Sequence, residues 1–330
     1  MRYNIAVIGS TGMVGRKTLE ILEELNLQNN NFFLFASSHS CGKKQKIGTA
    51  KFIVQELNKE NLLKQKYDYA LFCTRENISK EYVKQLAKTG TKVIDFSSAF
   101  RKNHPLIVPE INFEDIGNSN IICNPNCSTA ISVMALNNIS KHFGLEEIDF
   151  STYQAVSGAG KNAVDDLTKT NARKLKKLDY PIVNNVIPYI GGLDNAGFSV
   201  EENKMIFETN KILHLKETHI MANCVRIPVK NCHLISIVFK THKNASLQKM
   251  KKVLTESQGV EFSPNLLPMP LNANNQNNVI VGRLKAHKTI KNCFSMIVCG
   301  DNLRKGASLN AVQILKTLIE TNPHKTQPKN

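Results

Sequence analysis

Cys127 is the side chain whose position in the sequence most suggests chemistry. A short apolar segment, residues 121–123, precedes it, and apolar residues at helical spacing follow it over residues 131–139. Asn124 and Pro125 interrupt the chain between the two patterns. The sequence therefore predicts that Cys127 lies on a tight turn at the start of a helix.

The predicted helix ends near Phe143, where Gly144 would stop it. At its start, free backbone N–H groups and the positive end of the helix dipole favour the thiolate of Cys127 over the thiol. A thiolate there is a good nucleophile, and the neighbouring N–H groups suit an oxyanion. A buried, inert cysteine is the alternative, and this stretch alone leaves both interpretations open.

A glycine-rich turn at residues 9–15 lies between a buried-strand pattern at residues 4–8 and a helical pattern. This order of strand, turn and helix is the context in which such glycines indicate a dinucleotide site. Gly9 would permit the turn, Gly12 would let the backbone approach a pyrophosphate, and Gly15 would let the helix pack on the strand. The spacing is G-x-x-G-x-x-G, one residue longer than the commonest fingerprint, and a purely structural turn is the alternative.

The polar segment after a second predicted strand, residues 32–36, indicates which cofactor is bound. Sites that prefer NAD usually place an acidic residue at the end of this strand, and this sequence has none. Serines, His39 and Lys43 stand there instead and suit a 2′-phosphate. The segment therefore favours NADP over NAD, with an ordinary polar loop as the alternative.

The composition indicates a cytoplasmic protein of two domains. The 330 residues suffice for two domains, and a hydrophobic content of 42% excludes a disordered chain. No apolar run of about 18 residues predicts a membrane span, and the N-terminus enters a strand pattern rather than a signal peptide. The eight cysteines are therefore predicted to be thiols rather than disulfides.

The formal net charge of +16 permits nucleic-acid, membrane-surface or anionic small-molecule partners. The lysines are scattered, no basic tract is interleaved with aromatic residues, and there is no tryptophan. The charge therefore reflects a lysine-rich composition better than nucleic-acid binding, and we expect neither a nucleic-acid nor a membrane partner.

Strand and helix patterns alternate over about the first 125 residues, which predicts an α/β domain with a doubly wound parallel sheet. Arg101 closely follows one of these strands and is either an anion clamp or a surface arginine. The later part predicts an α+β domain with a mainly antiparallel sheet. Its expected elements are strands 150–155, 224–229, 233–239, 279–284 and 294–298, with 224–229 and 233–239 as a hairpin, and helices 162–176, 203–213, 247–255 and 307–319, the last returning to the first domain.

A dinucleotide turn and a nucleophilic thiol together point to aldehyde oxidation through a thioester. Separated cationic residues add an anionic substrate, with phosphate as a possible second substrate. Stretches in one order along nearly the whole chain resemble the aspartate-β-semialdehyde dehydrogenase family. They are residues 9–15, 97–101, 108–112, 124–129, 152–160, 201–205, 226–229 and 301–307.

The resemblance implies a Rossmann-like NADP domain at residues 1–126 with 305–330, and a catalytic and dimerisation domain at residues 127–304. It implies NADP-dependent conversion between aspartate semialdehyde and aspartyl phosphate, in lysine, threonine and methionine biosynthesis, by a homodimer or homotetramer. A metal is not expected, because the spacings of Cys123, Cys127, Cys232 and His233 match no zinc pattern.

The resemblance also implies residue roles. Cys127 would attack the aldehyde carbon, hydride would pass to NADP, and phosphate would resolve the thioester. His233, whose ordinary pKa suits the task, would be the general acid/base. The other implied contacts are Gln154 for the reacting group, Arg226 for the α-carboxylate, Glu201 for the α-ammonium, Arg101, Lys204 and Asn126 for phosphate, and Gly9, Thr11, Gly12, Met13, Val14, His39, Ser40, Ser157, Gly158 and Asn302 for NADP.

The chain departs from the family pattern at three positions. His39 stands where the family usually has arginine, Cys232 where it has glycine, and Leu234 where it has serine. The rival enzyme is N-acetyl-γ-glutamyl-phosphate reductase, which normally has glycine where Asn126 stands. A rival of another class is a catalytically inactive protein that binds a dinucleotide or nucleic acid.

Overall fold

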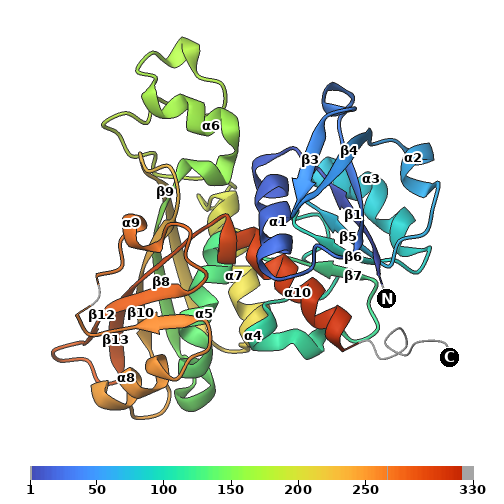
Figure 1. Cartoon of the computed structure of the whole chain (residues 1–330). Coiled ribbons are helices and arrows are strands. Elements are labelled where there is room, and N and C mark those ends of the chain that lie inside the picture. Colours follow the sequence, from blue (N-terminus) through green and yellow to red (C-terminus); the bar gives the residue numbers. More distant parts are fainter. Residues whose placement is uncertain (1, 266, 322–330) are drawn as a thin grey trace. The chain divides into compact units, whose positions relative to one another are not determined.

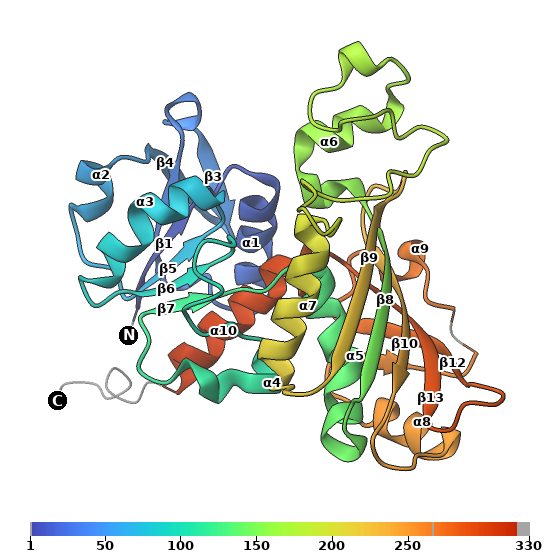
Figure 2. The same ribbon diagram turned by 180° about the vertical axis from the view of Figure 1, so that it is seen from behind.

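The computed structural model describes residues 2–265 and 267–321, and the chain divides into two compact units. Unit 1 comprises residues 1–125 and 307–330, and unit 2 comprises residues 126–306. Residues 322–330 of the predicted first domain lie outside the described residues. Each unit has its own sheet, labelled in Figures 1 and 2.

Unit 1 is built on a seven-stranded sheet in which every neighbouring pair except β3–β4 is parallel. In spatial order its strands are β3 (Lys44–Ile47), β4 (Ala50–Glu56), β2 (Asn31–Ala36), β1 (Asn4–Ile8), β5 (Tyr69–Phe72), β6 (Lys92–Asp95) and β7 (Ile121–Cys123). The chain leaves β1 in one direction for β2 and later crosses to β5 on the other side. The order therefore reverses between β1 and β5, and such a switch point is where open α/β sheets bind ligands.

The helices of unit 1 are α1 (Met13–Glu24), α2 (Lys59–Leu63), α3 (Glu76–Ala87), α4 (Pro109–Asn112) and α10 (Leu309–Glu320). Helices α1 and α10 pack against each other, and α3 packs on β6. Strand β5 is buried along its whole length because a parallel sheet is covered on both faces, which explains its unbroken apolar sequence. These features confirm the predicted doubly wound, Rossmann-like sheet.

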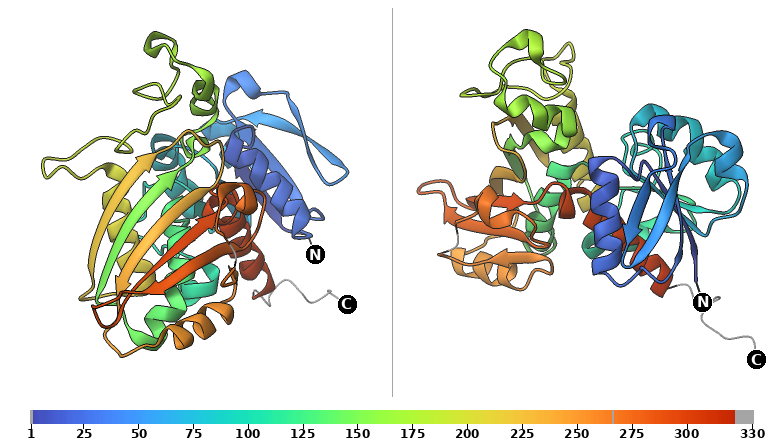
Figure 3. Two further views of the ribbon diagram at one scale, coloured as in Figure 1. Left: turned by 90° about the vertical axis from the view of Figure 1, so that its left-hand side faces the viewer. Right: turned by 45° about the horizontal axis from the view of Figure 1, so that its top comes forward.

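Unit 2 contains a six-stranded sheet, seen in the left view of Figure 3. In spatial order its strands are β11 (Val260–Phe262), β12 (Val279–Ala286), β13 (Cys293–Gly300), β10 (His233–Lys240), β8 (Glu147–Gln154) and β9 (His219–Arg226). Its helices are α5 (Cys127–Phe143), α6 (Lys161–Asp165), α7 (Val200–Leu213), α8 (Leu247–Thr255) and α9 (Pro270–Ala273). Burial alternates along β8, and α5, α7 and α8 pack on strands of the sheet, as expected for a sheet with one covered face.

The predicted hairpin between strands 224–229 and 233–239 is wrong. Strand β9 pairs with β8 in parallel, and β8 lies between β9 and β10. The chain after β9 passes over the end of β8, where Ile227 N–H donates to the carbonyl of Gln154 and Val156 N–H donates to that of Val229. The sheet is therefore mixed, with antiparallel pairs at β12–β13, β13–β10 and β10–β8.

The predicted helix over residues 162–176 is also wrong, because the chain turns after α6. The carboxylate of Asp166 accepts backbone N–H groups from Lys176 (2.8 Å), Lys177 (2.8 Å) and Leu178 (3.1 Å). An aspartate that binds later backbone groups offers the chain an alternative to a helix. Residues 156–189 consequently form an irregular lobe with a small apolar core of their own.

All eight cysteines are free thiols, as predicted. Within residues 2–265 and 267–321, no helix is long and apolar enough to cross a bilayer. The same residues contain no cluster of His, Cys, Asp and Glu that would hold a metal ion.

Candidate active site

Helix α5 begins at Cys127, as the sequence predicted, and ends at Phe143 with Gly144 after it. Asn126 caps the helix, because its Oδ1 accepts the backbone N–H groups of Ser128 (3.0 Å) and Thr129 (3.2 Å). Gly144 has φ +67°, a positive value that favours glycine, and its N–H donates to the carbonyl of Ser140. The local pattern around Cys127 therefore folds as its residue types dictate.

Cys127 and His233 face each other at the centre of unit 2. Sγ of Cys127 lies 3.1 Å from Nε2 of His233, and the other ring nitrogen, Nδ1, lies 3.0 Å from the backbone N of Ala155. His233 is the first residue of β10 and is fully buried. A thiol and an imidazole in contact, with the imidazole held from behind, form the usual arrangement of an activated nucleophile.

Glu201 lies beside this pair on the first turn of α7. Its Oε1 accepts from Nδ2 of Asn126 at 2.7 Å, and its Oε2 lies 3.4 Å from Nζ of Lys204. Burial raises the pKa of this carboxyl, but Lys204, the Asn126 amide and Arg226 outweigh burial and hold the pKa below its ordinary value. Glu201 is therefore a buried carboxylate with its charge retained.

Arg226 and Gln154 end adjacent strands and are paired in register. Nη1 of Arg226 donates to the carbonyl of Ala155 at 2.8 Å, and Nε2 of Gln154 donates to Oγ1 of Thr152 at 3.2 Å. A Cβ built on Gly158 would lie 3.5 Å from Nη1 of Arg226 and 3.6 Å from the ring of His233. The backbone at Gly158 therefore lies beside both functional side chains, at ordinary contact distances for a Cβ.

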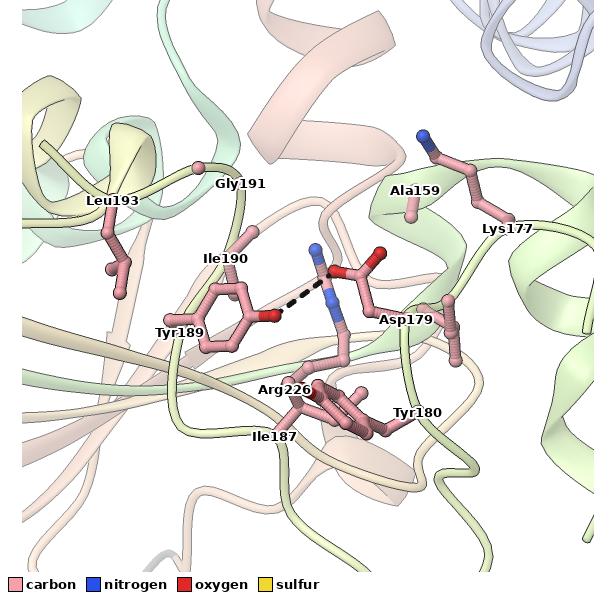
Figure 4. A pocket seen from close by; sticks show the side chains of 12 residues that line it. Ala159, Lys177, Asp179, Tyr180, Ile187, Tyr189, Ile190, Gly191, Leu193 and Arg226 are labelled. Atoms are coloured by element: carbon pink, nitrogen blue, oxygen red, sulfur yellow. Dashed lines mark hydrogen bonds between the residues drawn. The ribbon is translucent and has the colours of Figure 1, made fainter. Parts of the chain in front are cut away.

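Arg226 also borders a hollow of about 930 Å³ within unit 2. Figure 4 shows this hollow, with Lys177, Asp179 and Tyr189 from the irregular lobe on its wall. Tyr189 Oη donates to Oδ2 of Asp179 at 3.3 Å. The otherwise buried guanidinium is thus accessible from the hollow, and its planar fork suits a carboxylate.

The charges and burial around Cys127 do not favour a resting thiolate. Burial raises the pKa of the Cys127 thiol to about 12; Glu201 raises it too, while Arg226, Lys204 and the Ser128 N–H lower it. Burial and Arg226 lower the pKa of His233 to about 3, against an opposing effect of Glu201. The predicted thiolate is therefore replaced by a neutral thiol–imidazole pair, because desolvation outweighs the helix N-terminus.

The glycine turn of unit 1 fits a dinucleotide. Gly9 has φ +82°, and a Cβ on Gly15 would lie 2.1 Å from the carbonyl oxygen of Gly9, so both positions require glycine. A Cβ on Gly12 would meet only that same oxygen, at 3.4 Å, so internal packing does not require glycine there. Gly12 leaves the backbone open at the start of α1, where no side chain of the described residues caps the helix.

The loop after β2 reaches this turn, because Oγ1 of Thr11 donates to Oγ of Ser40 at 3.3 Å. His39 is exposed in the same loop. Met13 and Val14 open α1. Together with Gly9 and Gly12, these are the seven predicted cofactor residues that belong to unit 1. The other three, Ser157, Gly158 and Asn302, belong to unit 2.

Comparison with known proteins identifies the chain. A family model described as semialdehyde dehydrogenase, NAD binding domain, matches residues 4–119, and one described as semialdehyde dehydrogenase, dimerisation domain, matches residues 136–305. The aspartate-semialdehyde dehydrogenase of Aquifex aeolicus is 41% identical over 337 residues, covering 97% of this chain and 99% of the relative. The chain belongs to the aspartate-semialdehyde dehydrogenase family.

Other relatives agree with this identification and with the fold. The aspartate-semialdehyde dehydrogenase of Bacillus subtilis is 38% identical and covers 97% of this chain and 98% of its own. The crystal structure of aspartate semialdehyde dehydrogenase II from Vibrio cholerae, complexed with ASA, matches with a TM-score of 0.92 at 32% identity, over 98% of this chain and 99% of the other. The predicted family and the two-domain fold class are therefore confirmed.

Within this family member, unit 2 brings together six of the predicted catalytic and substrate residues besides Cys127. They are Asn126, Gln154, Glu201, Lys204, Arg226 and His233. Arg101 belongs to unit 1, where its Nη2 donates to the carbonyl of Phe96 at 2.8 Å and its charge lowers the pKa of Asp95, although burial raises that pKa more.

Three further groups of the candidate active site were missed by the sequence analysis. Oε2 of Glu208 accepts the backbone N–H of Asn126 at 2.7 Å, and Glu208 lies seven residues after Glu201 on α7, a spacing that could have revealed it. Gly306 packs against Cys127, because a Cβ there would lie 3.0 Å from Cβ of Cys127. The Ala155 N–H that contacts His233 is a backbone group, and no sequence pattern signals it.

Proposed function

We propose that the protein catalyses the NADP- and phosphate-dependent oxidation of L-aspartate 4-semialdehyde to L-aspartyl 4-phosphate, and the reverse reductive dephosphorylation. The observation that carries this proposal is the 3.1 Å contact between Sγ of Cys127 and Nε2 of His233, with Glu201 and Arg226 beside it. Together these residues offer a nucleophile, a proton acceptor and two opposite charges suited to a small amino acid.

The chemistry at Cys127 follows from this contact. Nδ1 of His233 accepts the Ala155 N–H, so the neutral ring carries its proton on Nε2. As Sγ attacks the aldehyde carbon, this Nε2 proton passes to the carbonyl oxygen and the thiol proton replaces it on Nε2. The positive end of the α5 dipole favours the charge that develops beside Cys127. NADP, when bound, would supply the chemistry that removes hydride from the tetrahedral carbon, and the hydroxyl proton passes to solvent. A phosphate oxygen then attacks the Cys127 thioester, the C–S bond breaks, the phosphate proton passes through His233 to Sγ, and the acyl phosphate leaves.

The charged side chains fix which aldehyde fits. Arg226 binds the α-carboxylate as a planar fork, and Glu201 binds the α-ammonium. Lys204 and Asn126, which both contact Glu201, are assigned to phosphate. Arg101 of unit 1 is assigned to phosphate, and Gln154 to the reacting group. A substrate whose amino group is acetylated has no ammonium group to pair with the Glu201 carboxylate, so it would lose that interaction.

The cofactor is assigned as NADP. Gly9, Thr11, Gly12, Met13 and Val14 would hold the pyrophosphate at the start of α1, where free N–H groups suit an anion. His39 and Ser40 would meet the 2′-phosphate, since the described loop over residues 37–43 contains no carboxylate to repel it. Ser157, Gly158 and Asn302 would hold the nicotinamide end in unit 2.

The assembly and the pathway are assigned from the family. Unit 2 carries the match to a dimerisation domain, which supports a homodimer or homotetramer built through this unit. The reaction would serve lysine, threonine and methionine biosynthesis. A cytoplasmic location stays a prediction from the thiol content.

A direct assay tests this function. Aspartate semialdehyde with NADP and phosphate should give NADPH, whereas N-acetylglutamate semialdehyde should not; a preference for the second aldehyde would reject the assignment. Cys127→Ala should abolish turnover and leave NADP affinity within about threefold, because the cofactor is held elsewhere. The matched control is Cys293→Ala, a half-buried free thiol on β13, and an acyl adduct mapped by mass spectrometry should appear on Cys127 alone.

A further inference from the structure

Cys232, the residue directly before His233, has a backbone conformation that its side chain disfavours. Its φ is +72°, in the left-handed region where residues other than glycine are uncommon. The side chain is fully buried in a small apolar cluster with Ala273, Ile280 and Cys299. A strained backbone persists only where surrounding contacts hold it, and the structure identifies the contact that holds Cys232.

That contact is the side chain of Asn302. The backbone N–H of Cys232 donates to Oδ1 of Asn302 at 2.8 Å, and Nδ2 of Asn302 donates to Oγ of Ser157 at 2.9 Å. Both Asn302 and Ser157 are buried. Asn302 is itself fixed, because the preceding Asp301 accepts the N–H of Leu303 at 2.8 Å and so holds the turn that carries the amide.

Asn302 thereby ties together the two segments that hold His233. One segment is Cys232 itself, which is bonded to the histidine. The other contains Ser157 and, two residues earlier, Ala155, whose N–H lies 3.0 Å from Nδ1 of His233. One amide side chain thus bridges the histidine backbone and the segment that contacts its ring, in addition to the pairing of His233 with Gly300 of β13.

Backbone hydrogen bonds between the same segments end short of Cys232. Val156 N–H donates to the carbonyl of Val229 at 2.9 Å, and Ser157 N–H donates to that of Lys230 at 3.0 Å. These bonds fix the chain two residues before Cys232. The left-handed turn at Cys232 is held by Asn302.

We propose that Asn302 is a positioning residue for the catalytic histidine: it holds Cys232 in the left-handed conformation and so directs Nε2 of His233 at Sγ of Cys127. The inference rests on the proposed function, in which His233 moves a proton at Cys127. It gives Asn302 a role in the protein that is separate from contact with a nucleotide.

The test combines removal of the Asn302 side chain with relief of the backbone strain at Cys232. Asn302→Ala should lower kcat, measured at saturating NADP, by about 10- to 100-fold, since a misplaced catalytic group costs that much. Glycine in Cys232→Gly adopts the left-handed conformation without help from the Asn302 hydrogen bond. The double variant Asn302→Ala/Cys232→Gly should therefore recover at least about tenfold in kcat over Asn302→Ala.

A second readout needs no cofactor. The rate at which iodoacetamide alkylates Cys127, followed by peptide mass spectrometry against pH, reports the contact with His233. Asn302→Ala should change this profile, and the double variant should restore it. Asn58→Ala is the matched control, because it removes an asparagine side chain that likewise accepts a backbone N–H, that of Asn61 at the start of α2, and should leave the profile unchanged.

Two results would overturn the proposal. One is an unchanged kcat for Asn302→Ala at saturating NADP, which would leave Asn302 as a cofactor contact alone. The other is a double variant no more active than Asn302→Ala. If Asn302→Ala does not fold, the effect of Asn302→Ala on kcat is measured in the Cys232→Gly protein instead. A decrease in kcat of about tenfold or more there would contradict the strain argument.

The test separates this inference from the function on which it rests. If Cys127→Ala and His233→Gln retain turnover, the proposed function fails. If both lose turnover while glycine at position 232 rescues nothing, only the positioning role of Asn302 fails.

Discussion

Sγ of Cys127 lies 3.1 Å from Nε2 of His233, yet both groups are neutral in the protein without substrate. Burial drives the pKa of the thiol up and that of the imidazole down, and Glu201 raises both. The charge state of the pair is therefore set mainly by burial and adjusted by Glu201. A bound α-ammonium group would offset Glu201 and would lower the pKa of both the thiol and the imidazole.

Glu201→Gln should make Cys127 more reactive in the free protein. Removing this negative charge lowers the pKa of the thiol, so iodoacetamide should alkylate Cys127 about 3- to 10-fold faster at pH 8. Lys204→Gln should act in the opposite direction, because the ammonium lowers the pKa of the thiol. The control is Glu146→Gln, a half-buried carboxylate paired with Lys240. Equal rates in the Glu201 and Lys204 variants would contradict the assigned electrostatics.

His233 should make the protein acid-sensitive below about pH 6.5. Its pKa is lowered from 6.5 to about 3 in the folded state, so the unfolded chain binds the proton more readily. The contribution of His233 to the free energy of unfolding is therefore fully present above pH 6.5. It falls by about 1.4 kcal/mol per pH unit as the pH decreases toward 3. Urea unfolding of wild type and His233→Gln at pH 7, 6 and 5 measures the difference.

His233→Gln, which cannot acquire this charge, should show a shallower loss of stability over that range. The folded-state pKa values of Glu201 and Asp166 lie below their ordinary values of 4.5 and 3.8, so their contributions are lost only at lower pH. Parallel stability curves for wild type and variant would show that His233 is not the source of the acid sensitivity.

The sequence predicted what local patterns determine. The helix from Cys127 to Phe143, the glycine turn after β1 and the parallel sheet around it all follow from spacing, capping residues and turn residues within a few positions of one another. The resemblance then supplied residues distant in sequence, such as His233 and Arg226, which local patterns alone would have left as an ordinary buried histidine and arginine.

The sequence did not predict features that depend on partners far along the chain. Insertion of β8 between β9 and β10 is fixed by pairing across about 70 residues, so the local hairpin pattern was misleading. Desolvation of Cys127 depends on the surrounding unit, which is why the expected thiolate is a thiol. The left-handed Cys232 is held by the hydrogen bond that its backbone N–H donates to Oδ1 of Asn302, 70 residues later.

Asp166 should be the main anchor of the irregular lobe beside Arg226. Its buried carboxylate accepts three backbone N–H groups and lies 3.0 Å from Nζ of Lys169. Burial raises its pKa, but these hydrogen bonds outweigh burial and hold the pKa at about 2. Asp166→Ala should leave the N–H groups unsatisfied, cost about 2–4 kcal/mol, and open residues 169–180 to limited proteolysis.

The neighbouring Asp165→Ala is the matched control, since that half-exposed carboxylate binds only the ammonium of Lys176 among the described contacts. It should leave stability nearly unchanged, because an ion pair this close to solvent contributes little. If the two variants are cleaved at the same rate, Asp166 does not anchor the lobe.

Gly12 and Gly15 should respond in opposite ways to one added methyl group. In Gly15→Ala the Cβ would lie 2.1 Å from the carbonyl oxygen of Gly9, so the turn must shift, and we expect a loss of about 3 kcal/mol or more in urea unfolding. In Gly12→Ala the Cβ has ordinary contact distance, and φ is −70°, so stability should fall by less than about 1 kcal/mol.

NADP affinity should nevertheless fall by about tenfold or more in Gly12→Ala, because the methyl group lies where the pyrophosphate must approach the backbone. Fluorescence titration with NADPH measures this. A folded Gly12→Ala variant that binds NADPH as tightly as wild type would show that the pyrophosphate does not lie on this turn.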